Sequence, residues 1–160
     1  MKYIITEQQY QLLMEKEKVM HLPSIDYFGG WDTMQSYLER KGNPLYSIDG
    51  NLNLYYSNIE SLGNLTSIGG YLNLYGTPIE SLGNLTSVGG DLNLRDSNIK
   101  SLENLTSVGG YLSLAGTKIK SLGNLTSVGG YLNLYGTPLS KKYSVAQIRQ
   151  MVNVGEGIYV

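Results

Sequence analysis

Apolar residues recur in the middle of the chain with a fixed period of 20 residues, and this periodicity predicts its architecture. Five copies of a unit close to SLGNLTSVGGYLNLYGTPIE begin at Lys41, Ser61, Ser81, Ser101 and Ser121. A short fixed period is the signature of a solenoid, in which each unit forms one coil and buries its apolar face by stacking on its neighbours. We therefore predict an α/β solenoid built as a stack of 20-residue coils.

Within one unit, the spacing of the apolar positions predicts a short strand and a return segment. Leu72 and Leu74 alternate with outward-facing residues, and a period of two indicates a strand with one buried face. Spacings of three, from Leu62 to Leu65 to Ile68, suit a tight extended or 3₁₀-like return. The strands of successive coils are then expected to lie side by side in one parallel sheet.

Glycines and hydroxyls recur at fixed places around the strand. The Gly-Gly pair before each strand predicts a sharp turn with a positive φ, and Asp49 takes the first of these positions in the first copy. Glu103 stands where three other copies have glycine, so that column is not expected to require glycine. A hydroxyl column after the strand is expected to satisfy backbone groups of an inward-facing turn; it consists of Ser57, Thr77, Ser97, Thr117 and Thr137.

This order of residues resembles the repeat of the leucine-rich repeat family, whose pattern is LxLxxNxLxxL. The resemblance covers residues 45–140 and is carried in the second copy by Leu72, Leu74, Thr77, Ile79, Leu82 and Leu85. The length of the unit is nearest the short bacterial class of such repeats, and the coils of receptor L domains are a second match. Ser or Thr replaces the family's asparagine, which implies that hydroxyls replace the family's asparagine ladder. The opening MKYIITEQQY also resembles the start of small uncharacterised marine phage proteins.

The flanking segments are suited to cover the two ends of the core, which a solenoid requires within its single domain, residues 1–160. Residues 1–40 are predicted as a helical N-terminal cap, with a strand at 2–6 and a helix at 7–20. A second helix is predicted at about 32–41, where Gly42 is the stop signal.

Residues 141–160 are predicted as a helix-plus-strand C-terminal cap that follows the five repeats of residues 41–140. A helix is expected at 144–152. A sixth strand should follow it, because three apolar residues near the end keep the spacing of Val128, Leu132 and Leu134; they are Val154, Ile158 and Val160.

The composition argues against several function classes. The 160 residues carry 12 basic and 13 acidic side chains, and this net charge of −1 argues against nucleic acid or an anionic membrane as the partner. Without cysteine, neither a disulfide framework nor a thiolate metal site can form. No secretory or membrane-spanning segment is predicted, so we expect a cytoplasmic protein, in the host cytoplasm if it is phage-encoded. The four NLT sequons belong to the repeat and are interpreted as structural.

The sequence offers no constellation of acid, base, nucleophile and metal ligands. His21 is the only histidine and is interpreted as structural. Glu60 and Glu80 share a column of the repeat, but are expected in solvent on the turn after the strand. We therefore predict that the chain is not an enzyme and has no catalytic residue, cofactor or metal site.

The outward columns of the strand vary among the copies, whereas the core columns barely vary. They predict an exposed sheet surface rich in Tyr and Asn, residue types that are common in protein recognition surfaces. We expect a partner protein to bind there, and its identity and the oligomeric state do not follow from the sequence. The partner-binding candidates are Tyr55, Tyr71, Tyr75, Asp91, Arg95, Tyr111, Ala115, Tyr131 and Tyr135. Ala115 is expected to leave a notch bordered by Arg95 and Tyr135, with Tyr111 nearby.

Three other interpretations stay open. Stacked Tyr and Asn residues also stabilise parallel strands as ladders, and Arg95 can simply stack on Tyr75 or pair with Asp91. The C-terminal end is basic and can bind nucleic acid or another anion, with tyrosines stacking on bases; its cations are Lys118, Lys120, Lys141, Lys142 and Arg149. A structural or assembly role is the third.

Overall fold

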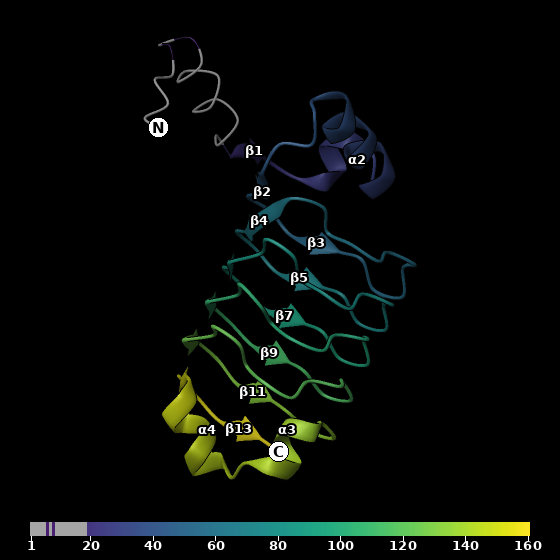
Figure 1. The fold of residues 1–160 in the computed structure, drawn as a ribbon. Helices are drawn as coiled ribbons and strands as arrows, with labels where there is room; N and C mark the ends of the chain where they lie inside the picture. The colour runs from purple at the N-terminus through teal and green to yellow at the C-terminus, as the bar shows by residue number, and fades with distance from the viewer. Residues whose placement is uncertain (1–5, 7, 9–18) are drawn as a thin grey trace, which may run out of the picture.

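The computed structural model describes residues 6, 8 and 19–160. Residues 20–160 form a stack of coils with short parallel strands, a β-solenoid, and its end caps (Figure 1). Each coil contributes one strand to each of two sheets, here called sheet A and sheet B. The strands of sheet A, in spatial order, are β1 (Met20–Leu22), β2 (Tyr46–Ile48), β4 (Leu65–Ile68), β6 (Ser87–Val88), β8 (Ser107–Val108), β10 (Ser127–Val128) and β12 (Asn153–Val154). Those of sheet B are β3 (Leu52–Asn53), β5 (Leu72–Asn73), β7 (Leu92–Asn93), β9 (Leu112–Ser113), β11 (Leu132–Asn133) and β13 (Ile158–Tyr159).

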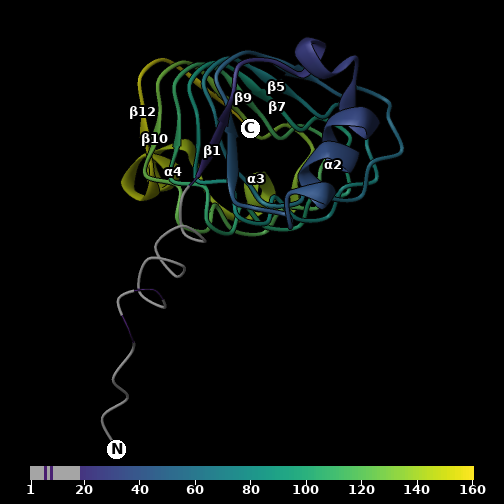
Figure 2. The ribbon, with the colours of Figure 1, turned by 90° about the horizontal axis from the view of Figure 1, so that it is seen from above.

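The predicted solenoid and its 20-residue coil are confirmed, but the parallel strands lie in two sheets where the sequence predicted one. Sheet B contains the predicted strand, because Leu72 pairs with Leu92 across a coil. Sheet A arises from the return segment, which is extended enough to pair with its copies, as Val88 does with Val108. Seen along the stack, the coils overlie one another (Figure 2).

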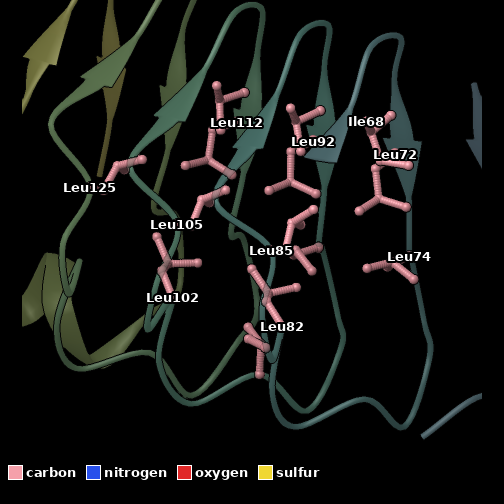
Figure 3. Packing of buried hydrophobic residues seen from close by; sticks show 14 of the residues in the cluster. Ile68, Leu72, Leu74, Leu82, Leu85, Leu92, Leu102, Leu105, Leu112 and Leu125 are labelled. Atoms are coloured by element: carbon pink, nitrogen blue, oxygen red, sulfur yellow. The ribbon is translucent and has the colours of Figure 1, made fainter. Parts of the chain in front are cut away.

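The core is a set of columns in which each side chain lies on its own copy in the next coil. Leu74, Leu94 and Leu114 of one column are all 0% exposed, and Figure 3 shows the leucines of neighbouring coils packed in this way. The return segment supplies further columns, including Leu85 and Leu105. Identical residues are in contact at the coil spacing of about 4.8 Å, so one side-chain shape has to fit every layer.

The structure overturns the prediction for the Gly-Gly pairs, whereas Glu103 does replace glycine in the other column as expected. The Gly-Gly pairs do not have a positive φ; instead, a Cβ at Gly109 would lie 2.0 Å from the carbonyl oxygen of Gly89. The column that was not expected to require glycine is left-handed, with φ of 58° at Gly83 and 48° at Glu103. The first column is therefore small because backbones approach closely, and the second accepts Glu103 despite the strain of that conformation.

The polar columns divide between bonds within a coil and bonds between coils. Each hydroxyl of the column that includes Thr117 donates to a carbonyl three residues earlier, here Leu114 at 2.7 Å, as predicted for an inward-facing turn. The ladder between coils uses other residues: Thr106 Oγ1 donates to the Thr86 carbonyl at 2.9 Å, and Asn104 Nδ2 donates to the Gly83 carbonyl at 2.9 Å. An asparagine ladder therefore exists, but at the sequon position rather than in the hydroxyl column.

The N-terminal end is covered by a short 3₁₀ helix, η1 (Ile25–Phe28), and by α2 (Trp31–Arg40), close to the helix predicted at 32–41. Gly42 ends α2 as predicted: with a φ of 82° it donates to the Glu39 carbonyl, while Asn43 donates to the Leu38 carbonyl. Most of the predicted strand at 2–6 and helix at 7–20 lies outside the described residues. The end of that helix was predicted wrongly, because Met20 begins strand β1 and pairs with Tyr46.

The C-terminal end is closed by α3 (Pro138–Lys142), α4 (Val145–Met151) and the last two strands (Figure 1). Ser144 begins α4 with a capping box that includes Gln147. The predicted sixth strand is confirmed, since Val154 pairs with Val128 in β10 and Ile158 pairs with Leu132 in β11.

Truncation of the central leucine column should be far more damaging than truncation of its neighbour. Leu94→Ala should lower the free energy of unfolding by roughly 2–5 kcal/mol, because Leu94 is fully buried between two coils. Asn93→Ala should lower it by only about 1 kcal/mol, since the side chain makes one local hydrogen bond. Urea unfolding measures both, and equal losses would contradict the orientation of the strand.

The close approach of the glycines can be tested in the same way. Gly109→Ala should destabilise the fold by about 1–3 kcal/mol or more, because the new methyl group forces two coils apart at the Gly89 carbonyl. Ser107→Ala, two residues earlier on the same coil, is the control and should stay within about 0.5 kcal/mol. A harmless Gly109→Ala would mean that the coils can separate freely.

Tyr46 links the N-terminal cap to the second coil and should give the fold a dependence on alkaline pH. Its hydroxyl donates to the Leu62 carbonyl at 2.7 Å and accepts from Gln35 Nε2 at 3.1 Å, and burial raises the pKa of Tyr46 to about 12. Because this pKa lies above the usual value near 10, the contribution is complete below about pH 10 and is lost between about pH 10 and 12. Tyr46→Phe should be about 1–3 kcal/mol less stable at pH 7, and its deficit relative to the natural chain should shrink above pH 10. A deficit that is independent of pH in urea titrations would contradict this assignment.

Candidate interaction surface

The outer surface of sheet B carries three columns of side chains, which we call the Tyr/Asn face. Its first column is Asn51, Tyr71, Asp91, Tyr111 and Tyr131; the middle one is Asn53, Asn73, Asn93, Ser113 and Asn133; the third is Tyr55, Tyr75, Arg95, Ala115 and Tyr135. Every residue predicted to bind a partner therefore lies on one surface of the stack, on or beside the strands β3 to β11 in Figure 1. These residues differ in how far their side chains are already engaged in hydrogen bonds and ring contacts within the chain.

The middle column mainly supports the backbone. Asn93 Oδ1 accepts from the Arg95 amide at 3.1 Å, and Asn133 Oδ1 accepts from the Tyr135 amide at 3.0 Å. Asn133 also donates to the Tyr111 hydroxyl at 3.0 Å. The two bonds to backbone amides stay within one coil and hold the third column in place, and only the bond between Asn133 and Tyr111 joins two coils.

The first column is divided between structural and exposed residues. Asp91 Oδ1 accepts a hydrogen bond from the backbone amide of Tyr111 in the next coil at 2.7 Å, so this carboxylate links two neighbouring coils. Tyr131 packs on Tyr159 with ring centroids 5.5 Å apart. The Glu156 carboxylate, which accepts a hydrogen bond from Tyr131, raises the pKa of that tyrosine. Only part of the Tyr131 ring is therefore free to contact another molecule.

Along the third column runs a row of stacked side chains, Tyr56, Tyr75 and Arg95. Tyr56 was not among the predicted residues. Tyr56 packs on Tyr75 with centroids 4.8 Å apart, and Arg95 Cζ lies 5.9 Å from the centroid of the Tyr75 ring. Arg95 Nε pairs with Asp96 Oδ2 at 3.2 Å, rather than with Asp91 as one interpretation of the sequence expected. The hydrogen bond with Tyr75 raises the pKa of Tyr56.

Tyr56 was missed because it stands in a column where other copies have glycine. It adopts the left-handed φ of that column, 52°, as does Asp96 with 54°. A non-glycine residue in this conformation is uncommon, and the substitution at these two copies was the available signal. Tyr56 is 63% exposed and extends the row of aromatic side chains beyond the predicted set.

The predicted notch is present as a hollow of about 420 Å³ at the lower end of this row. Ala115 forms its floor and is only 6% exposed, whereas Tyr135 at its rim is 70% exposed. The residues that line it are Arg95, Asp96, Ala115, Gly116, Asn133, Tyr135 and Gly136. Tyr111, which was expected nearby, does not line the hollow but bonds to Asn133, which does.

A second, longer hollow of about 580 Å³ follows the outer surface of sheet A from His21 to Gly155. Its floor is the ladder of small residues that includes Ser87 and Gly89. His21 Nδ1 lies 2.7 Å from Ser47 Oγ, a hydrogen bond between neighbouring strands. Within the described residues, no group of three or more His, Cys, Asp or Glu side chains could hold a metal ion.

One cation of the basic C-terminal end is engaged in hydrogen bonds within the chain. Arg149 donates to the carbonyls of Val154 and Glu156, at 3.2 and 2.8 Å. Further up the stack, Lys100 and Glu80 form the predicted contact at 2.6 Å, and this hydrogen bond lowers the pKa of Glu80. Both side chains are exposed to solvent, so the pair adds little to stability.

No protein-family model, curated protein or solved structure matches the chain significantly. Among the described helices, none has the length and apolar character needed to cross a membrane. The classification therefore rests on the fold itself: the chain is a repeat protein of the parallel β-solenoid type.

Proposed function

We propose that the chain is a non-enzymatic interaction module that binds a partner protein through the Tyr/Asn face, with the hollow over Ala115 as its anchor. The observation that carries this proposal is the hollow itself. It lies where the third and fourth copies depart from the repeat, beside an exposed guanidinium and the exposed ring of Tyr135. A gap bordered by Arg and Tyr suits the side chain of a partner, because such residues dominate binding energies at protein interfaces.

The stacking around the hollow also supports this function. Arg95 is held between Tyr75 and Asp96, so little freedom is lost when a partner contacts it. The rigid stack of coils likewise presents the face without rearrangement. These features favour a preformed surface over one that folds on binding.

The proposal also includes the protein family and the cellular location. The LxLxxTxIxxLxxL pattern, with stacked parallel strands, supports a repeat of the leucine-rich type, although both sides of each coil here are strands. The resemblance of the opening residues supports a phage protein that acts on a host factor in the host cytoplasm.

A second candidate function is binding of nucleic acid or another anion by the C-terminal end, because Lys118, Lys120 and Lys141 are exposed there. A structural or assembly role is the third. Salt separates the first two: binding at the basic end should fall steeply between 50 and 200 mM salt, as counterion release requires, whereas binding at the Tyr/Asn face should change little.

Capture from a native host lysate, followed by mass spectrometry, would identify the partner. Ala115→Tyr should then weaken binding at least about tenfold by filling the hollow, with little change in the temperature of unfolding. Lys118→Tyr is the matched control: it adds the same side chain to the same coil, outside the hollow, and should leave affinity unchanged. If Ala115→Tyr and Arg95→Ala both bind normally, the hollow is not the anchor; if Lys118→Tyr alone weakens binding, the basic end is the site.

A further inference from the structure

The N-terminal edge of sheet B ends in an open strand. β3 is the last strand of that sheet in the described part of the chain. The amides of Leu52, Leu54 and Tyr56 donate to carbonyls of the next coil, each at 2.8 Å. In a parallel ladder, alternate residues direct their amide and carbonyl groups to opposite sides. Asn53 and its alternate neighbours therefore point theirs away from β5, toward the end of the stack.

The core under this edge is covered less completely than in the next coils. Leu54 is 7% exposed, whereas its copies in the next coils are 0% exposed. Ile59 is only partly buried, although Ile79 of the next coil is 0% exposed. At the opposite end of the same columns, α3 and β13 leave Leu134 and Leu139 at 0% and 1%. Within the described residues, the N-terminal cap thus covers this side of the first coil less completely than the C-terminal cap covers its own end.

A hollow of about 440 Å³ separates this edge from the cap. Asn51 and Asn53 line one side, and the loop after η1 lines the other with Gly29 and Gly30. A Cβ at either glycine would meet nothing within 4 Å, so neither glycine packs closely against another described part of the chain. Among the described residues that line the hollow, Asp26 is the only charged one, and it is exposed.

We propose that this edge binds an extended strand of a partner protein, which extends sheet B and places a basic side chain beside Asp26. Backbone groups of the added strand would pair with those of Asn53, and its apolar side chains would cover Leu54 and Ile59. This is strand addition, in which backbone hydrogen bonds give affinity and pockets give specificity. The inference rests on the proposed function only in taking the partner to be a protein.

The chemistry of the edge favours a strand over other occupants. Proteins normally protect an open edge with lysine, proline or a bulge, but the sequence NLNLYY of residues 51–56 has neither a charge nor a proline. A strand can pair with the backbone of Asn53 and cover Leu54 at the same time, because backbone and side chains of a strand point in different directions. Asp26 favours a cationic strand, since an acidic one would meet like charge.

The test uses the full chain and the acetylated, amidated peptide VKVKVK as the probe. In the free protein the Asn53 amide should exchange rapidly with solvent, and the peptide should bind saturably and slow that exchange. Asn53→Pro should weaken binding at least about tenfold, because it removes the edge donor and its ring blocks the new strand. Asn53→Ala, which keeps the backbone amide, is the control and should retain affinity within about threefold. Asp26→Asn should weaken binding about twofold to fivefold.

Proline is tolerated on edge strands, and a peptide with methylated backbone amides tests the same contact without altering the protein. Equal affinity of the methylated peptide would overturn the proposal, as would stronger binding of VEVEVE.

An Asn53 amide already protected in the free monomer would show that the chain covers its own edge. Self-association abolished by Asn53→Pro would assign the edge to a second copy. Either result would overturn the proposal of a partner strand. The hollow over Ala115 lies in the fourth copy of the repeat, three coils from the β3 edge. An Ala115→Tyr variant with unchanged affinity would therefore count against the proposed function, whereas failure of the peptide to bind would count only against strand addition.

Discussion

Successive coils lie so close together that the backbone of one rests on the carbonyl oxygens of the coil before it, and the rest of the structure depends on this contact. Gly89 and Gly109 permit it because neither has a side chain. The same approach brings Thr106 and Asn104 within reach of carbonyls on the preceding coil. It also sets the leucine columns in direct contact, so hydrogen bonding and apolar burial require the same spacing.

The sequence predicted the elements that depend on periodicity and the caps that depend on local signals. The strand phase of Leu72 and Leu74, the stop at Gly42 and the strand at Val154 all follow from patterns within a few residues. The second sheet did not, because the apolar residues of the return segment, such as Leu65 and Ile68, are three positions apart and lack the period of two that identifies a strand. The Gly-Gly pairs were assigned a positive φ because composition does not distinguish a positive φ from a close backbone contact.

The candidate surface was predicted as a set of columns, and the structure separates those columns by their internal bonds. The asparagines and Asp91 are engaged with backbone amides, so their outward position does not leave them free. Arg95 and Tyr135 keep their exposure beside the buried Ala115. Sequence alone could place the hollow, because it follows from one small residue in a column of large ones. It could not find the Tyr56 stack, which needs the left-handed backbone at that residue.

The threonine donors between coils point toward the N-terminus: Thr86, Thr106 and Thr126 each donate to the coil made before it. A coil leaving the ribosome therefore meets acceptors that are already in place, and none of these bonds waits for residues still to be translated. Contacts about 20 residues apart require only short loops to close, which favours rapid docking of each new coil. The stack is thus suited to being built in the order of synthesis, with the last two strands and α4 completing the end.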